Sequence, residues 1–80
     1  MKYWALFYEF VDDMINRRMP YREEHLRLIR DGHARGEIHM AGAIGDPPDG
    51  GLLVFRAESN AVAEKFAGED PYVRNGLVTN

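Results

Sequence analysis

The sequence predicts an α+β fold in which strands alternate with two amphipathic helices. Residues 3–10 form an aromatic and aliphatic run, and residues 20–34 place apolar side chains at helical spacing. A glycine- and proline-rich turn cluster at residues 45–51 separates two short β-prone stretches. Together, these three observations predict the class.

The first predicted strand covers residues 3–10. Alternate residues share one face of a strand, and both faces are largely apolar here, with Glu9 as the exception. One face carries Trp4, Leu6, Tyr8 and Phe10, and the other carries Ala5, Phe7 and Glu9. This pattern favours a central strand that is covered on at least one side.

The first helix is predicted from Pro20 to about residue 34. A polar connection, residues 11–19, precedes it, and Asp12 and Asp13 could cap a short turn there. Pro20 suits the first helical turn, because its missing N–H costs nothing at that position. Gly36 offers a left-handed stop at the other end.

The apolar stripe of this helix is expected to pack on the sheet. Spacings of four, three and four residues place four side chains on one contiguous arc. These side chains are Tyr21, His25, Leu28 and Ile29. His25 is therefore predicted on the sheet side of the helix rather than the solvent side.

A second and a third strand are predicted to form an antiparallel hairpin. Residues 37–43 alternate weakly between apolar and polar types. Residues 52–55 are fully apolar, which is typical of a strand buried on both faces. The turn cluster at residues 45–51 supplies a longish loop between them.

The rest of the chain predicts a second helix and the start of a last strand. Ser59 is a good N-cap, and Pro71 disfavours continued helix at Asp70. The apolar side of this helix carries Val62, Ala63, Phe66 and Ala67. Asn75-Gly76 is a turn dipeptide, and residues 77–79 are again β-prone.

The order strand–helix–strand–strand–helix–(strand) is the ferredoxin-like, split βαβ pattern. Residues 1–80 are read as a single domain, since no composition shift, internal repeat or low-complexity segment divides them.

The composition restricts the class of protein further. Hydrophobic types make up 45% of the 80 residues, which favours a folded domain over a disordered chain. A chain of this size has a thin core, and the absence of cysteine removes disulfides as a source of stability. Association with a second copy is one of the few remaining sources, so we expect a homodimer.

The charge pattern argues against two classes of partner. The formal net charge is −3, whereas a nucleic-acid binder usually carries a basic stripe. The N-terminal apolar run is too soon interrupted by acids for a signal peptide or a membrane span. We therefore expect no nucleic acid, no membrane and a cytoplasmic location.

Several segments resemble those of the YCII-related family of small α/β proteins. The shared segments are the aromatic first strand ending near Tyr8-Glu9, the stretch Arg22-Glu23-Glu24-His25-Leu26, Ala41-Gly42 at the end of the second strand, and Gly50-Gly51 before the third. The most specific is Asp70-Pro71-Tyr72-Val73, followed after two residues by Gly76-Leu77. The resemblance covers nearly the whole chain.

This resemblance implies a ferredoxin-like fold that pairs into a dimeric α/β barrel. It also implies a His–Asp active site, for which the matching positions are His25 and Asp70. One characterised type in the family removes chloride from a chlorinated hydroxyhydroquinone in aromatic degradation. The wider fold group includes muconolactone isomerases, which also transfer protons.

The chain departs from the family pattern at two places. Members usually complete a last strand after the Gly-Leu pair, whereas four residues follow Gly76 here. We therefore expect a final strand that is short or truncated, which bears on the edge used for dimerisation. Many members carry proline after the glycine that closes the second strand, where this chain has Ala43; that change bears on the rim of the pocket.

His25 is the strongest candidate for chemistry. The imidazole has its unperturbed pKa nearest neutrality and can accept and return protons. The alternative is that it is a hydrogen-bonded structural residue on an apolar helix face. Both interpretations stay open on the sequence alone.

Asp70 also has two interpretations. A carboxylate at the end of a helix is unfavourable with respect to the helix dipole, and a partner such as His25 would compensate. The pair would orient the ring and favour the imidazolium that forms after proton abstraction. Alternatively, Asp70 starts an Asx-type turn.

Four further residues are expected to bind substrate: Tyr8, Arg22, Pro71 and Tyr72. Arg22 lies three residues before His25, so the two are neighbours on the helix, and it could hold an anionic or phenolate oxygen. The alternative is that the aromatic rings belong to the core and that the arginine is solvated.

Other catalytic and binding chemistry lacks support. Ser59 is better explained as a cap than as a nucleophile, and no G-x-S-x-G is present. His25, His33 and His39 have no metal-ligand spacing. Gly50-Gly51 has no phosphate-loop pattern around it. We expect no metal and no cofactor.

Two functions are therefore predicted. In the first, the chain is a cofactor-free lyase or isomerase that uses the His25–Asp70 pair on a small cyclic or aromatic substrate, the most concrete example being a dehydrochlorinase. In the second, it is a non-catalytic dimeric module that binds a small metabolite or assists a larger enzyme. A cleft that holds the polar tips of both residues favours the first, and a filled core favours the second.

Overall fold

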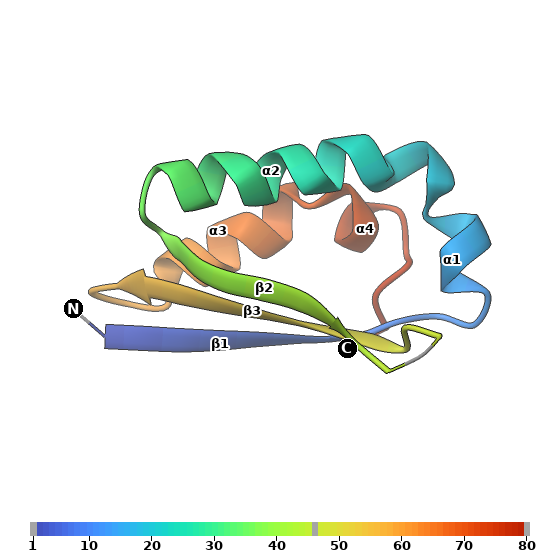
Figure 1. Cartoon of the computed structure of the whole chain (residues 1–80), viewed down its shortest axis with the longest axis horizontal. Helices are drawn as coiled ribbons and strands as arrows, with labels where there is room; N and C mark the ends of the chain where they lie inside the picture. Colours follow the sequence, from blue (N-terminus) through green and yellow to red (C-terminus); the bar gives the residue numbers. More distant parts are fainter. Residues whose placement is uncertain (1, 46, 80) are drawn as a thin grey trace.

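The structure, a computed structural model, describes residues 2–45 and 47–79, and within them an antiparallel sheet carries helices on one face (Figure 1). The elements in chain order are β1 (Lys2–Glu9), α1 (Met14–Arg17), the 3₁₀ helix η1 (Met19–Tyr21), α2 (Arg22–Ala34), β2 (Ile38–Ile44), β3 (Gly50–Ala57), α3 (Ala61–Glu69) and α4 (Pro71–Arg74). Met1, Asp46 of the predicted turn cluster, and Asn80 lie outside the described residues.

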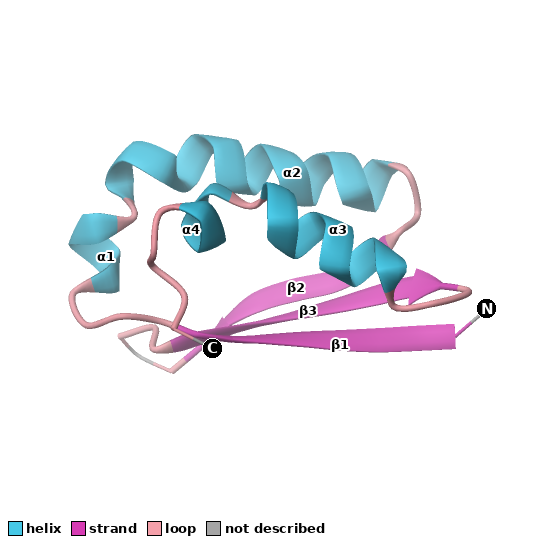
Figure 2. Ribbon diagram, turned by 180° about the vertical axis from the view of Figure 1, so that it is seen from behind, coloured by secondary structure: helices cyan, strands magenta, loops and turns pink. Residues whose placement is uncertain are grey.

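The sheet topology confirms the ferredoxin-like prediction. The strand order is β1-β3-β2, with β3 antiparallel to both neighbours. The strands β1 and β2 therefore run parallel to each other with β3 between them, which is the split βαβ arrangement. The view from behind shows α2, α3 and α4 on the same side of the sheet (Figure 2).

The predicted central position of β1 is wrong. This strand pairs with β3 on one side and forms an edge of the sheet along most of its length. Phe7 on its second apolar face is 62% exposed, which shows that helices do not cover that face. Two apolar faces therefore indicated an uncovered sheet surface here rather than a central position.

The hairpin of β2 and β3 forms as predicted, with longer strands. The third strand begins at Gly50 rather than at residue 52. A Cβ atom at Gly50 would lie 2.6 Å from the carbonyl oxygen of Tyr8. Only glycine allows β1 to approach this closely. The expectation that residues 52–55 are buried on both faces is wrong: Leu53 and Phe55 are buried, whereas Leu52 and Val54 are half-buried.

The first long helix starts two residues later than predicted. Pro20 lies in η1, where the Tyr21 N–H donates to the Arg18 carbonyl at 2.9 Å, and α2 begins at Arg22. Gly36 has a φ of 78°, as expected of a left-handed stop. The sequence did not predict α1, whose Met14 is buried against Tyr72 and Leu77.

The turns around α1 and α3 use polar side chains near the predicted caps. Asp13 has a φ of 60° and accepts a hydrogen bond from the Asn16 side chain at 2.7 Å, rather than capping α1. Asn60, not Ser59, occupies the N-cap position of α3. The Ser59 hydroxyl accepts from the Ala61 N–H at 3.3 Å, so it still satisfies one donor of the first turn.

The C-terminal segment lies against the end of β1. The Thr79 N–H donates to Glu9 O at 2.8 Å, the Val11 N–H donates to Leu77 O at 3.0 Å, and Phe10 and Val78 form an antiparallel bridge. Residues 77–79 thus occupy the start of the fourth-strand position of the ferredoxin-like fold without extending into a strand.

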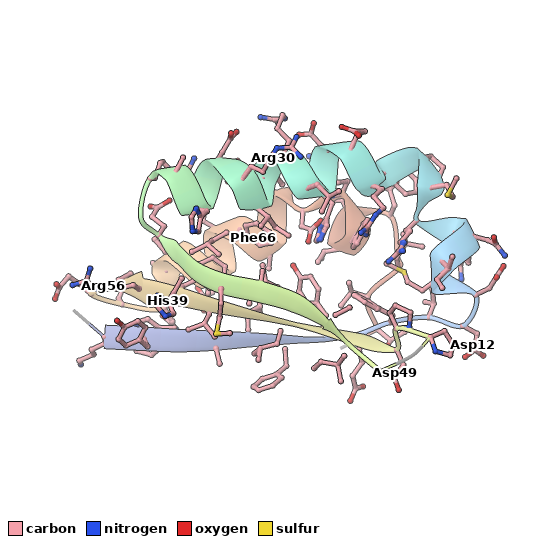
Figure 3. The ribbon with its side chains drawn as sticks, in the orientation of Figure 1. Asp12, Arg30, His39, Asp49, Arg56 and Phe66 are labelled. Carbon is pink, nitrogen blue, oxygen red and sulfur yellow. The ribbon has the colours of Figure 1, made fainter. Side chains whose placement is uncertain are left out.

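The main core lies between the helices and the sheet. Its buried members are Tyr8, Ile38, Leu53, Phe55, Ala63 and Phe66. Phe66 of α3, labelled below α2 in Figure 3, meets the ring of Phe55 at a centroid distance of 5.6 Å. Burial of such aromatic side chains gives about 1.5–3 kcal/mol each, so this layer holds α3 onto the sheet.

The opposite face of the sheet exposes a set of large apolar side chains, which we call the open sheet face: Tyr3 at 58%, Phe7 at 62%, Met40 at 56% and Ile44 at 43% exposure. The ring of Tyr3 lies 5.3 Å from that of His39, which Figure 3 labels on β2. Large exposed apolar side chains gathered on one face commonly mark an interaction surface.

Two glycines in helices are expected to respond oppositely to alanine. At Gly32 in α2, a Cβ atom would lie 2.5 Å from Cδ1 and 2.8 Å from Cγ1 of the buried Ile38. Overpacking of about 1–3 kcal/mol should outweigh the helix preference of about 1 kcal/mol for alanine. We expect Gly32→Ala to lower the free energy of unfolding by about 1 kcal/mol.

Gly68→Ala in α3 is the matched control, because nothing lies within 4 Å of its Cβ position. It should raise the free energy of unfolding by about 0.5–1 kcal/mol. Urea unfolding of both variants measures the two signs, and a stabilised Gly32→Ala protein would contradict the packing of α2 on β2.

Candidate active site

A pocket of about 280 Å³ opens between the N-terminal half of α2 and the sheet. One wall comes from Arg22, His25, Leu26 and Ile29 of α2 and from Arg18 on the preceding turn. The other walls come from Tyr8, Phe10, Ala41, Gly42, Ala43, Gly51, Leu52, Leu53 and Tyr72. The walls are thus mainly apolar, with a few polar groups, as is usual for a small-molecule site.

Asp70 holds the residues of this site together. It is 0% exposed, and three donors satisfy its carboxylate. Oδ1 accepts from the Tyr72 N–H at 3.0 Å and lies 2.8 Å from His25 Nδ1, and Oδ2 accepts from the Tyr8 hydroxyl at 2.9 Å. Because a buried carboxylate without partners is strongly unfavourable, these contacts are what allow it to sit there.

The Asp70 position follows from the local sequence. The α3 helix ends at Glu69, and Pro71 occupies the first position of α4. Asp70 lies between the two helices in an extended conformation and is the N-cap residue of α4. The turn-forming interpretation and the histidine-partner interpretation of Asp70 therefore both hold, because one carboxylate serves both contacts.

His25 presents its other ring nitrogen to the pocket. Nδ1 is engaged with Asp70. Within residues 2–45 and 47–79, no fully buried side-chain nitrogen or oxygen lacks a hydrogen-bond partner. Since no partner for Nε2 is found in that part of the chain, Nε2 contacts accessible space, although His25 as a whole is 8% exposed. The pocket that His25 lines is that space.

The ring of Tyr72 fixes the plane of the imidazole. The two rings are stacked with centroids 3.8 Å apart and planes 7° apart, and Phe66 meets the imidazole edge-on at 6.5 Å. The Tyr72 hydroxyl accepts a hydrogen bond from Arg22 Nη1 at 3.1 Å. Arg22, Tyr72, His25 and Asp70 therefore form one connected set.

Tyr8 is held in its neutral form. Burial, followed by the charge of Asp70 and the hydrogen bond to it, raises the pKa of the Tyr8 hydroxyl well above its ordinary value of 10.0. Tyr8 is therefore a donor to Asp70 at any physiological pH. The neutral Tyr8 hydroxyl is therefore a hydrogen-bond donor in this set rather than a base.

The arrangement suits general acid–base chemistry. When Nδ1–H donates to the carboxylate, Nε2 carries the lone pair, so the contact with Asp70 selects the tautomer that can accept a proton from a molecule in the pocket. The same carboxylate stabilises the imidazolium that results. This tautomer is assigned from the hydrogen-bond partners.

The structure places the six candidate residues at different depths. Tyr8, Arg22, His25 and Tyr72 line the pocket. Asp70 lies behind them and reaches the pocket only through its partners. Pro71 is not among the described lining residues; its carbonyl accepts from the Asn75 side chain at 2.7 Å, and its position starts α4.

The sequence did not indicate Arg18, Ala41 or Gly42 as pocket residues, whereas Ala43 was expected to bear on the pocket rim. Arg18 lies on the turn between α1 and η1, and Ala41, Gly42 and Ala43 form the opposite rim. A signal for Arg18 existed, because it precedes Arg22 by one helical turn. This signal was missed because residues 11–19 were predicted to be a polar connection without helical structure.

Two other findings concern metal ions and membranes. Within the described residues, no group of three or more His, Asp or Glu side chains is placed to hold a metal ion. His33 is exposed on α2, and His39 lies on β2 beside Tyr3, so neither joins His25. No helix in the same part of the chain has the length and apolar character needed to cross a membrane.

Known proteins share this architecture. The family model of the YCII-related domain matches residues 1–80. An uncharacterized protein of Haemophilus influenzae is 27% identical over 84 aligned residues, which cover 94% of this chain and 86% of that protein. The 5-chloro-2-hydroxyhydroquinone dehydrochlorinase of Burkholderia phenoliruptrix, solved in complex with 2,5-dihydroxybenzoquinone, superposes with a TM-score of 0.80.

That enzyme is 20% identical in sequence, and the match covers 99% of this chain and 87% of the enzyme chain. Likeness at this identity establishes the shared fold.

The raised pKa of Tyr8 predicts a loss of stability at high pH. The folded protein keeps this proton where the unfolded chain, with a pKa near 10, releases it. The stabilisation is therefore complete below about pH 10 and is lost as the pH rises toward the folded-state pKa, by up to about 1.4 kcal/mol per pH unit. Urea unfolding between about pH 8 and pH 11 measures this slope.

Tyr8→Phe is the comparison protein, because it keeps the ring and removes the proton. Its free energy of unfolding should be lower at neutral pH, since Asp70 loses a donor, and it should fall less steeply above about pH 10. Equal slopes for the two proteins would contradict the buried Tyr8–Asp70 contact.

Proposed function

The chain belongs to the YCII-related family, and on that premise we propose that it is an enzyme that moves protons on a small ring through its His25–Asp70 pair. The observation that supports this most is that the two ring nitrogens of His25 have different surroundings. Nδ1 is fixed by a fully buried carboxylate, while Nε2 contacts the pocket. A histidine with a purely structural role gains nothing from an accessible nitrogen in a pocket.

The proposed reaction needs only proton transfer. His25 Nε2 removes a proton from a carbon or oxygen of the substrate, and the electron pair that remains moves into the ring. In an isomerisation the imidazolium returns the proton to another atom. In a dehydrochlorination the imidazolium returns the proton to the ring carbon that bears chlorine. His25 then removes a second hydroxyl proton, chloride leaves with the C–Cl bonding pair to give a quinone, and the imidazolium releases this proton to water. Asp70 stabilises the imidazolium in both cases.

A chlorinated hydroxyhydroquinone is the most concrete substrate that we propose. The fold is shared with a dehydrochlorinase that acts on such a ring. The pocket volume of about 280 Å³ is near the lower bound of about 300 Å³ for ligand pockets, which favours a single ring. Stacked and apolar walls from Tyr72, Phe10 and Leu53 suit an aromatic face.

We further propose that the protein works as a homodimer that pairs through the open sheet face. Tyr3, Phe7, Met40 and Ile44 are exposed there, and the helices lie on the other face of the sheet (Figure 2). Covering them with the same face of a second copy would give each sheet a second apolar layer, as in a sheet-on-sheet packing. The two pockets would remain on the helical sides of their sheets.

His25→Asn tests the catalytic proposal. Asparagine keeps an N–H donor for Asp70 but has no group that can accept a proton at neutral pH. Turnover of a panel of chlorinated and hydroxylated aromatic rings, followed by chloride release and by absorbance, should fall by about 10²–10⁴. His33→Asn, on the exposed end of the same helix, is the matched control and should keep full turnover.

An His25→Asn enzyme as fast as the wild type would contradict the proposal. Binding of rings without turnover by the wild type would instead favour a metabolite-binding module.

Phe7→Lys tests the dimer. A charged side chain at this exposed position would be buried in the proposed interface, which is strongly unfavourable, while the fold of one chain should tolerate it. Sedimentation velocity at micromolar concentration should show the wild type as a dimer of the 9.2 kDa chain and the variant as a monomer. Met19→Lys, 71% exposed on the helical side, is the control and should stay dimeric.

A wild type that sediments as a monomer would overturn the dimer.

A further inference from the structure

The pocket concentrates positive charge in a chain that is negatively charged overall. Two arginines, Arg18 and Arg22, line it, and both are half-buried. Within residues 2–45 and 47–79 its lining contains no aspartate or glutamate, although the whole chain carries a net charge of −3. The nearest carboxylate that the site holds, Asp70, is fully buried and already satisfied by three donors.

Within the described residues, neither Arg18 nor Arg22 forms an ion pair. The arginines that do form one there are Arg27 and Arg35, which do not line the pocket. Two guanidinium groups on one small pocket repel each other and have lost part of their water. Such an arrangement is favourable when an anion occupies the space between them.

The fold positions both side chains. Arg22 is the first residue of α2, and its contact with the Tyr72 hydroxyl at 3.1 Å uses one of its five N–H donors. Because Tyr72 is stacked on His25, this contact sets Arg22 at a fixed place relative to the imidazole. Arg18 is held at the start of η1 by backbone bonds to Met14 and Tyr21.

We propose that Arg18 and Arg22 form an anion-binding arm, so that the ligand of this pocket is a single ring that carries an anionic oxygen group, either a carboxylate or an ionised phenol. This inference rests on the proposed function for the site and adds the charge of its substrate. The arm holds the charged group, and the remainder of the ring extends toward Nε2 of His25. Arg18 is thus a binding residue that sets specificity.

A pair of probes that differ in one charge tests the arm: 2,5-dihydroxybenzoate and the neutral hydroquinone. Titration of each into the ¹⁵N-labelled protein near neutral pH gives the affinity and the location of binding by NMR. We expect 2,5-dihydroxybenzoate to bind at least about tenfold more tightly, with shifts at Arg22, His25 and Gly42. Its affinity should fall with added salt, while that of hydroquinone should not.

Arg18→Gln should weaken binding of 2,5-dihydroxybenzoate by about ten- to a hundredfold and leave hydroquinone unchanged. Arg17→Gln is the matched control: Arg17 is its exposed neighbour, does not line the pocket, and should behave as wild type. The salt titration of the wild type needs no variant, so it decides the question even if Arg18→Gln folds poorly.

The same titrations in His25→Asn separate this inference from the catalytic proposal. If the preference for the anion and its dependence on Arg18 persist there, the arm stands whether or not His25 is the base. Equal affinities for the two probes, a salt-independent preference, or no detectable binding of 2,5-dihydroxybenzoate would each overturn it.

Discussion

The carboxylate of Asp70 is the constraint on which the rest of the structure depends. It is fully buried, so its charge is tolerated only because donors from three separate elements reach it: Tyr8 from β1, His25 from α2, and the Tyr72 N–H from α4. Removal of the Tyr8 hydroxyl would leave Oδ2 without a partner, and removal of either other donor would leave Oδ1 with a single one. The mutual placement of the sheet edge and both helical segments is therefore fixed at this one group.

The same constraint links architecture and chemistry. The contact that orients the imidazole also caps a helix, and the ring that stacks on the imidazole also receives the Arg22 guanidinium. A rigid imidazole in one tautomer is what general base chemistry requires. In this chain it results from satisfying the hydrogen bonds of a buried acid, without an additional set of residues devoted to the task.

The order of elements could be predicted from the sequence because it rests on periodicity and turn residues. The aromatic run of β1, the stripe of α2 and the glycine–proline turn are local signals, and His25 falls in the buried stripe at helical spacing. The place of β1 in the sheet could not be predicted in this way. An apolar outer face reads the same whether another layer of the protein covers it or, as at Phe7, the fold leaves it bare.

The site was predictable only in part, for a related reason. The residues that meet at Asp70 are far apart in sequence, and no local pattern reports such a contact; the family resemblance indicated the pair. Arg18 was missed because α1 lies in a polar stretch without helical periodicity, where tertiary contacts of Met14 with Tyr72 and Leu77 decide the structure. Tertiary packing commonly overrides weak local preference in this way.

The separation of the partners along the chain has a consequence for the order of events during synthesis. Tyr8 and His25 meet Asp70 across 62 and 45 residues. The first 69 residues of the chain can be made without either side chain having its partner. Contacts of such long range form late, since the loop between them must first be closed. A nascent or interrupted chain therefore lacks the buried contacts that orient the imidazole, and the geometry of the pocket arises in the same step that completes the fold.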